Sequence, residues 1–319
     1  MRCRYACCVS LTGGVFPIPV GVLSAIARCP RFGRLCPRDR STGAKWVVGW
    51  LLGSKRHRRS AVWTLIGLWL VLAPAVVPAA AADAFDEAVE RYRHYLVDDI
   101  DRTLASAREL RDRVITDDIA EARKAWIDAR VGWERSEVFT TGFVPALDDA
   151  IDAWPDAVTG FHGIEVKLFG PERSDMREEL DALIARLGEL DEQVRNIKLT
   201  PQGLYNGIAR LAYEVGDSKV DGGESRVSGT SLNDMRNNVD GIELAYRTLF
   251  ASPLTVTDPK LADEVRGEIE RLQNLVDARD LKSIDPDQLR KATEALVVSL
   301  QIAAPKLGLD APTLEETAK

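Results

Sequence analysis

Apolar residues recur every three or four positions along most of the chain from residue 84 onward, which is the spacing of one face of an α-helix. A long helix is predicted at 84–115, with apolar positions at Phe85, Val89, Tyr92, Leu96, Ile100, Leu104 and Leu110. A second is predicted at 118–138, where Asp118 can cap the first turn and Trp126 and Trp133 face inward.

The same pattern continues between short polar connections. Loops are predicted at 140–155, which is rich in Gly, Pro and Asp, and at 218–228, which reads SKVDGGESRVS. Further helices are predicted at 157–169, 174–198, 200–217, 229–251, 258–279 and 286–304. No alternating run predicts a strand, so we expect an all-α fold built of antiparallel helix bundles.

Residues 1–82 differ from the rest in composition. They contain 12 of the 42 Lys and Arg residues but a single acid, and all five cysteines. Within them, a basic segment, an apolar core at 61–77 and the alanines at 80–82 are typical of a secretory signal peptide, predicted at 55–82. A permanent membrane anchor is the alternative. Residues 1–54 lack periodicity, and we interpret them as misassigned upstream translation or a disordered segment.

The remaining residues, 83–319, are acidic and contain no cysteine. They carry 30 basic and 48 acidic side chains, a net charge of −18. This excess disfavours nucleic acid and anionic membranes as partners and favours cations. The lack of cysteine excludes disulfides and thiolate metal sites. We expect an exported domain in the periplasm or another extracytoplasmic compartment, without a permanent anchor after cleavage.

The segment GFHGIEVKLFG, at 160–170, places a histidine and a glutamate three residues apart. At this spacing His162 and Glu165 lie on one helix face and can point at one spot. The pair could ligate a metal, or it could be a structural histidine hydrogen-bonded to an acid. The other histidine after residue 83, His94, lies among charged neighbours and is predicted to be a surface residue.

Other carboxylates could complete a site with this pair. Glu134 and Glu137 repeat the three-residue spacing beside Trp133, although a solvated helix end with ion pairs to Arg130 and Arg135 would also explain them. The aspartates of LDDAIDAW could bind a metal or simply cap turns: Asp148, Asp149 and Asp152. Glu214 is a fourth candidate on a largely apolar helix face. One histidine and several carboxylates converging in a bundle would suit iron, manganese or zinc.

Several segments in order resemble the imelysin-like family, which includes the EfeO/EfeM-type periplasmic iron-uptake components. Residues 160–165 match its GxHxxE signature, WERSE at 133–137 resembles its YERIE-type segment, and AIDAW at 150–154 its IDAR-type segment. The block at 211–246 is similar to EVxxxKIxGEExxxSHTDLxDFxANxxG, but SHTDL reads SGTSL at 228–232 and DFxAN reads DMRNN. A metal site built on the lost histidine and acid is therefore doubtful.

The resemblance implies a fold, a ligand set and a partner. The fold would be two packed lobes, each like a four-helix bundle, over 83–319, without the copper-binding cupredoxin domain of longer EfeO proteins. The cargo would be Fe2+ or Fe3+, with Zn2+ or another divalent metal as the alternative. The partners would be a membrane iron permease and a haem peroxidase-type protein of the same uptake system. The ligands implied by motif position are His162, Glu165, Glu134, Glu137 and Asp152, with Glu214 less certain.

Three hypotheses about function follow. The first is a non-enzymatic binding protein that captures iron and passes it to the permease. The second is a metal-dependent zinc peptidase, because the family is named for a proteolytic activity, although HExxH and a Ser/His/Asp trio are absent from 83–319. A third, an envelope protein that binds anionic polysaccharide through a bridging metal, is disfavoured by the net charge of −18.

Overall fold

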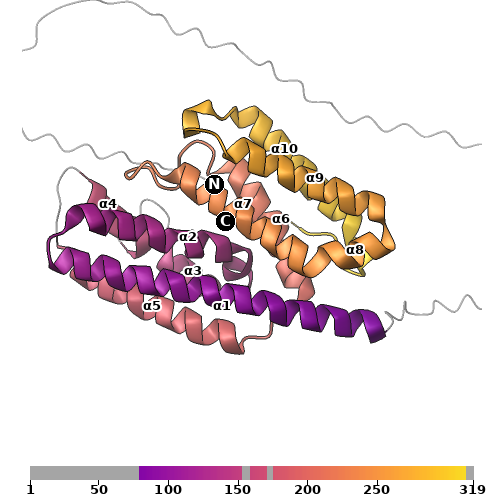
Figure 1. Cartoon of the computed structure of the whole chain (residues 1–319), viewed down its shortest axis with the longest axis horizontal. Helices are drawn as coiled ribbons and strands as arrows, with labels where there is room; N and C mark the ends of the chain where they lie inside the picture. The colour runs from indigo at the N-terminus through magenta and orange to yellow at the C-terminus, as the bar shows by residue number, and fades with distance from the viewer. Residues whose placement is uncertain (1–78, 153–158, 171–174, 314–319) are drawn as a thin grey trace, which may run out of the picture. The chain divides into compact units, whose positions relative to one another are not determined.

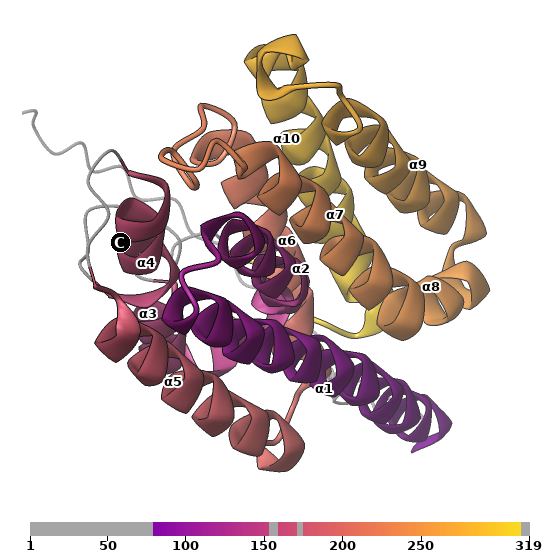
Figure 2. The same cartoon turned by 60° about the vertical axis from the view of Figure 1, so that its left-hand side comes forward.

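The described part of the chain is a set of α-helices that pack side by side in two bundles (Figures 1 and 2). The computed structural model describes residues 79–152, 159–170 and 175–313, which belong to one compact unit. No strand occurs among these residues, so the all-α prediction is confirmed. The predictions for residues 1–54 and for most of the signal peptide lie outside the described residues.

The first bundle contains the N-terminal helices, and α2 is its innermost member. It consists of α1 (Ala79–Ile115), α2 (Ile119–Phe143), α3 (Pro145–Ile151), α4 (Gly160–Phe169) and α5 (Arg177–Asn196). Helix α1 packs along both α2 and α5, while the short helices α3 and α4 contact α2 and α5.

The second bundle contains the C-terminal helices, drawn in orange to yellow in Figure 2. It consists of α6 (Pro201–Asp217), α7 (Ser231–Ala245), α8 (Ala251–Thr257), α9 (Pro259–Val276) and α10 (Pro286–Ala303). A π-helical turn, Tyr246–Phe250, joins α7 to α8, and the short 3₁₀ turns Leu281–Ser283 and Ala304–Leu307 flank α10.

Helix α2 also joins the two bundles, because it packs against α6 and α7 as well as against the helices of its own bundle. The backbones come close together at Gly207 of α6, where a Cβ atom would clash with the carbonyl oxygen of Val138. The apolar residues of both bundles form one continuous buried cluster that includes Trp126, Tyr205 and Leu296. The charged site described below lies at this junction.

The starts of some helices were predictable from capping residues. Asp118 accepts a hydrogen bond from the backbone of Glu121 at the start of α2, and Thr200 accepts one from Gly203 at the start of α6. Such a cap stabilises a helix by about 1 kcal/mol. Proline follows Thr200 at the first helical position, where its missing N–H costs nothing.

Two predictions about elements were wrong. Residues 140–155 are not all loop, because α2 continues to Phe143 and α3 occupies Pro145–Ile151. The helix predicted at 229–251 ends at Ala245 and is followed by the π-helical turn and by α8. None of the helices in the described ranges combines the length and apolarity needed to span a membrane.

Candidate metal centre

The first turn of α4 is attached to the end of α3. Gly160 begins α4 with a φ of +65°, a left-handed conformation that favours glycine. A Cβ atom there would also clash with the carbonyl oxygen of Ile151, the last residue of α3. The glycine therefore allows α4 to start directly against α3, which brings His162 close to Asp152.

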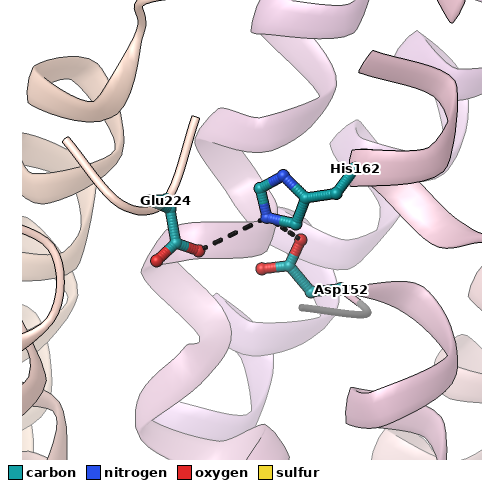
Figure 3. Close-up of side chains that lie close together, drawn as sticks. All are labelled: Asp152, His162 and Glu224. Atoms are coloured by element: carbon teal, nitrogen blue, oxygen red, sulfur yellow. Dashed lines mark ion pairs between the residues drawn. The ribbon is translucent and has the colours of Figure 1, made fainter. Parts of the chain in front are cut away.

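Asp152, His162 and Glu224 converge from three different segments (Figure 3). Nε2 of His162, on α4, lies 3.4 Å from Oδ1 of Asp152 at the end of α3. The same nitrogen lies 3.7 Å from Oε1 of Glu224, in the segment that connects α6 to α7. All three side chains are at most 7% exposed. Their ligand-type atoms lie within 4.8 Å of one another, which is close enough to share one metal ion.

Glu165 holds the other side of the imidazole ring. Its Oε2 atom is 3.0 Å from Nδ1 of His162. Its Oε1 atom accepts hydrogen bonds from the backbone N–H groups of Val227 (3.1 Å) and Ser228 (2.7 Å) and from the Ser228 hydroxyl (2.7 Å). Burial raises the pKa of Glu165, but the hydrogen bonds from His162 and Ser228 outweigh burial and keep this pKa below its ordinary value. Glu165 thus fixes the orientation of His162 and leaves Nε2 facing the two other carboxylates.

A second group of carboxylates shares Glu224 with the first. Glu134 and Glu137 project from α2, and their oxygens lie within 4.8 Å of a Glu224 oxygen. The ammonium group of Lys219 lies among them, 3.2 Å from Glu134, 2.8 Å from Glu137 and 3.5 Å from Glu224. The side-chain amide of Asn238, on α7, donates to Glu134 at 2.9 Å and to Glu137 at 2.6 Å. Glu134 and Glu137 are therefore already supplied with hydrogen-bond donors.

Arg130 contacts carboxylates of both groups, and its side chain is fully buried. Its guanidinium donates to Asp152 at 2.6 Å, to Glu224 at 3.3 Å and to Glu134, as well as to Asp234 of α7 at 3.3 Å. The same guanidinium lies 5.4 Å from the ring centroid of Trp126 and 5.5 Å from that of Phe161. A buried arginine that binds four carboxylates keeps them together in spite of their mutual repulsion.

The concentration of buried charge shifts several pKa values. Burial lowers the pKa of His162, but the charge of Asp152 and the hydrogen bonds to Glu165 and Glu224 outweigh it and raise this pKa to about 9. Burial, together with Glu134, raises the pKa of Glu137 well above its ordinary value. Burial also raises the pKa of Asp234 to about 7, in spite of the neighbouring Arg130. At all three residues the buried and charged surroundings favour the protonated form.

The structure brings most of the predicted residues together. His162, Glu165, Asp152, Glu134 and Glu137 all lie in the cluster. The alternative of a solvated helix end for the glutamate pair is wrong, because Glu134 is fully buried and Glu137 is 8% exposed. Glu214 lies outside both groups: its carboxylate is 3.1 Å from Arg210, and its side chain is 25% exposed. Asp148 accepts from Thr141 on α2, and Asp149 and His94 are exposed.

Sequence reasoning missed four charged residues of the cluster: Arg130, Lys219, Glu224 and Asp234. The sequence indicates Arg130 only as an ion-pair partner at a solvated helix end. Lys219 and Glu224 both lie in the 211–246 block that resembles the family. That resemblance was the one signal in the sequence that could have marked these two loop residues as part of the site. The altered SGTSL segment contributes through Ser228, which binds Glu165, and through Ser231, which accepts from the backbone of Ser225 at 3.0 Å.

The donor atoms suit a hard or borderline cation. One imidazole nitrogen and carboxylate oxygens are ligands for iron, manganese or zinc, whereas Cu(I) prefers sulfur. One oxygen of Glu224, Oε2, is buried and accepts no hydrogen bond from the described residues, although Lys219 lies 3.5 Å from it. This oxygen faces the second group, where the ammonium of Lys219 is the neighbouring cation, while Oε1 faces Nε2 of His162. Asp152, His162 and Glu224 could provide three ligands to one ion.

Comparison with known proteins finds one family model. Residues 88–158 and 156–306 match the model described as Imelysin (Peptidase_M75). A solved structure from Parabacteroides distasonis, described as an iron-regulated protein A precursor, has a TM-score of 0.56 and 18% sequence identity. That match covers 70% of this chain and 95% of the solved one, and it shows that the two share a fold.

Curated relatives are similar to the chain over more than half of its length. The "Efem/EfeO family lipoprotein" of Staphylococcus haemolyticus is 28% identical over 61% of this chain and 71% of its own length. The "Iron uptake system component EfeM" of Pseudomonas syringae is 29% identical over 56% of this chain and 66% of its own. The "Iron uptake system component EfeO" of Escherichia coli O157:H7 is 27% identical over 66% and 59%, respectively. The chain thus spans less than two thirds of the latter two relatives.

Proposed function

The chain belongs to the imelysin family, and we propose that it is an exported protein that binds Fe2+ or Fe3+ and delivers the ion to a membrane iron permease. The observation that carries the proposal is the convergence of Asp152, His162 and Glu224 from three segments into one buried group. The names of the curated relatives, iron uptake system components, support iron as the cargo. The word lipoprotein in the name of the staphylococcal relative supports an extracytoplasmic location.

In this proposal, Nε2 of His162 and the carboxylates of Asp152 and Glu224 hold the ion. Glu134 and Glu137 stand behind Glu224 and add negative charge, while Glu165 holds the ring of His162 through Nδ1. A partner that orients a ligating histidine in this way typically raises metal affinity 10- to 100-fold. Glu214 is left out of the ligand set because it pairs with Arg210.

Binding and release follow from the charge of the site. An incoming cation would replace the proton of His162 and add positive charge where carboxylates outnumber Arg130 and Lys219. Protonation of His162 would favour release. Transfer to a permease, and a haem peroxidase-type partner in the same uptake system, are further parts of the proposal.

The experiment is an anaerobic Fe2+ titration of the purified chain and of two histidine variants. We expect His162→Ala to lose at least about 100-fold in iron affinity, because it removes the nitrogen ligand and leaves its carboxylate neighbours without the imidazole. His94→Ala is the matched control, since His94 is exposed on α1, and it should bind like the wild type. Equal iron affinity in all three proteins, with intact folding by circular dichroism, would reject the proposal.

A zinc peptidase is the second candidate, because the family model carries a peptidase name. A catalytic zinc needs an open position for water and a general base next to it. The other carboxylates of the second group, Glu134 and Glu137, already accept hydrogen bonds from Lys219 and Asn238 and would have to exchange these for a water molecule. Incubation of the zinc-loaded protein with unfolded casein tests this alternative, and cleavage that is abolished by His162→Ala would favour it.

A further inference from the structure

Lys219 occupies the centre of the second carboxylate group. Its ammonium nitrogen lies 2.8 Å from Glu137, 3.2 Å from Glu134 and 3.5 Å from Glu224, and its side chain is 4% exposed. The ammonium group has three donors. It donates hydrogen bonds to Glu134 and Glu137 and forms an ion pair with Glu224. The lysine therefore stands where a metal ion bound by the same three oxygens would have to be.

Glu224 connects this group to the histidine group. Its Oε1 atom faces Nε2 of His162 at 3.7 Å, and its Oε2 atom faces Nζ of Lys219 at 3.5 Å. A carboxylate whose two oxygens serve two neighbouring cation positions is a typical element of two-metal centres in helical carboxylate proteins. The arrangement has the ligands of a two-metal centre, but a lysine fills one of its positions.

We propose that Lys219 serves as a built-in second cation, which limits the centre to one metal ion per chain. The inference rests on the proposed function, in which the first ion binds at Asp152, His162 and Glu224. Lys219 is outside the GxHxxE motif and is not among the proposed metal ligands. Its role is to set the number of ions, and thereby the positive charge, that the site can accept.

Displacement of this lysine by a metal would be unfavourable for two reasons. The ammonium is covalently attached to the segment after α6, so it competes as a local group at a high effective concentration. It is also buried, and separating a buried charge from its partners costs several kcal/mol unless the charge reaches water. Glu134 and Glu137 are further fixed by Asn238, whose amide donates to both.

The test compares the number of ions bound by the wild type and by variants at position 219. Mn2+ is the probe, since it accepts oxygen and nitrogen ligands and is visible by electron paramagnetic resonance. We expect Lys219→Met, which keeps the length of the side chain without its charge, to bind one more Mn2+ than the wild type in equilibrium dialysis. The added ion should also produce the broadened resonance of a spin-coupled pair. Lys219→Arg keeps the charge and should bind the same number as the wild type.

Further variants assign the added ion to the second group. In Lys219→Met/Glu137→Gln, the loss of one carboxylate should abolish the added ion. If Lys219→Met does not fold without metal, its thermal melting is repeated with Mn2+: recovery of the fold together with the added ion supports the proposal, and no recovery overturns it.

Three results would overturn the inference: two ions on the wild type, no added ion on folded Lys219→Met, or an added ion that survives Glu137→Gln. Failure of the proposed function looks different, since the wild type would then bind no ion at the histidine group. In that case a single ion gained by Lys219→Met would still support the role of the lysine, and none would contradict it.

Discussion

The two ligand groups that share Glu224 differ in the group that accompanies the carboxylates. In the first, the imidazole of His162 faces Asp152 and Glu224, and it can lose its proton and become a ligand. In the second, the ammonium of Lys219 faces Glu134, Glu137 and Glu224. The second group thus offers no nitrogen ligand while the lysine keeps its proton. In our proposal similar carboxylates therefore bind a metal ion beside His162 and an ammonium group beside Lys219.

Arg130 contacts both groups, so its substitution is expected to have the largest effect. Arg130→Met would leave Asp152, Glu134, Glu224 and Asp234 without their shared guanidinium. We expect a loss of about 3–5 kcal/mol in the free energy of unfolding, because removal of one partner leaves buried charges uncompensated. Urea denaturation followed by circular dichroism measures the change.

A matched substitution separates the loss of buried charge from the loss of any arginine. Arg91 on α1 pairs with Glu87, and both side chains are more than half exposed. Arg91→Met should therefore change the free energy of unfolding by less than about 0.5 kcal/mol. A loss of similar size in both variants would contradict the role given to Arg130.

The pH dependence of metal binding distinguishes the two groups next. The pKa of His162 is raised from 6.5 to about 9 in the metal-free protein, so the proton must leave before Nε2 can bind an ion. Mn2+ affinity should rise about tenfold per pH unit up to pH 9 and then level off. For Lys219, burial lowers the pKa, but Glu134, Glu137 and Glu224 raise it well above its ordinary value, so Lys219 itself adds no slope in this range. Titration calorimetry between pH 6 and 9.5 measures the slope, and a constant affinity over that range would contradict the assignment of His162 as the ligand.

The same shift affects stability without metal. A histidine whose folded-state pKa lies above its unfolded value stabilises the fold fully below pH 6.5, and this contribution is lost as the pH rises through about 9. The melting temperature of the metal-free wild type should therefore fall over this interval more than that of His162→Ala. Parallel curves for the two proteins would show that the histidine is not charged in the fold.

Substitution of Glu165 is expected to have the smallest effect, and it tests the first group alone. In Glu165→Gln the carboxylate that holds Nδ1 of His162 becomes neutral, and we expect about a tenfold loss of metal affinity. The rise of affinity with pH should also level off at a lower pH, because one of the groups that raise the pKa of His162 has lost its charge. Titration calorimetry at several pH values measures both changes.

Glu214→Gln is the control for Glu165→Gln, since Glu214 lies outside both groups beside Arg210. Its metal affinity and pH profile should match those of the wild type. An effect as large as that of Glu165→Gln would return Glu214 to the site.

The helices with several turns were predictable because their apolar faces repeat often enough to be recognised. Helix α3 was not, since its seven residues make only about two turns and begin with a proline that resembles a chain break. The division of 229–251 was missed for a different reason. The backbone remains helical through the π-helical turn at Tyr246–Phe250, so the apolar pattern continues across it.

The predicted part of the site followed a similar rule. The pairs Glu134–Glu137 and His162–Glu165 were identified because a three-residue spacing has a known meaning within a helix. Glu224 and Lys219 lie between α6 and α7, where spacing along the sequence does not determine which way side chains point. Glu214 illustrates the converse: an acid on an apolar helix face was a reasonable candidate, but a local ion pair with Arg210, four residues earlier, accounts for it.

The position of α2 has a mechanical consequence for the site. Neighbouring helices pack around α2, and at Gly207 the backbone of α6 lies directly against it. Arg130, Glu134 and Glu137 therefore project from a helix that is held on several sides. Lys219 and Glu224 are mounted on the segment between α6 and α7, which is made of turns and bends. We therefore expect Glu224 to shift more readily than the carboxylates on α2. Ions of different radius would then be accommodated by movement of Glu224 toward or away from α2, with little adjustment of the helices.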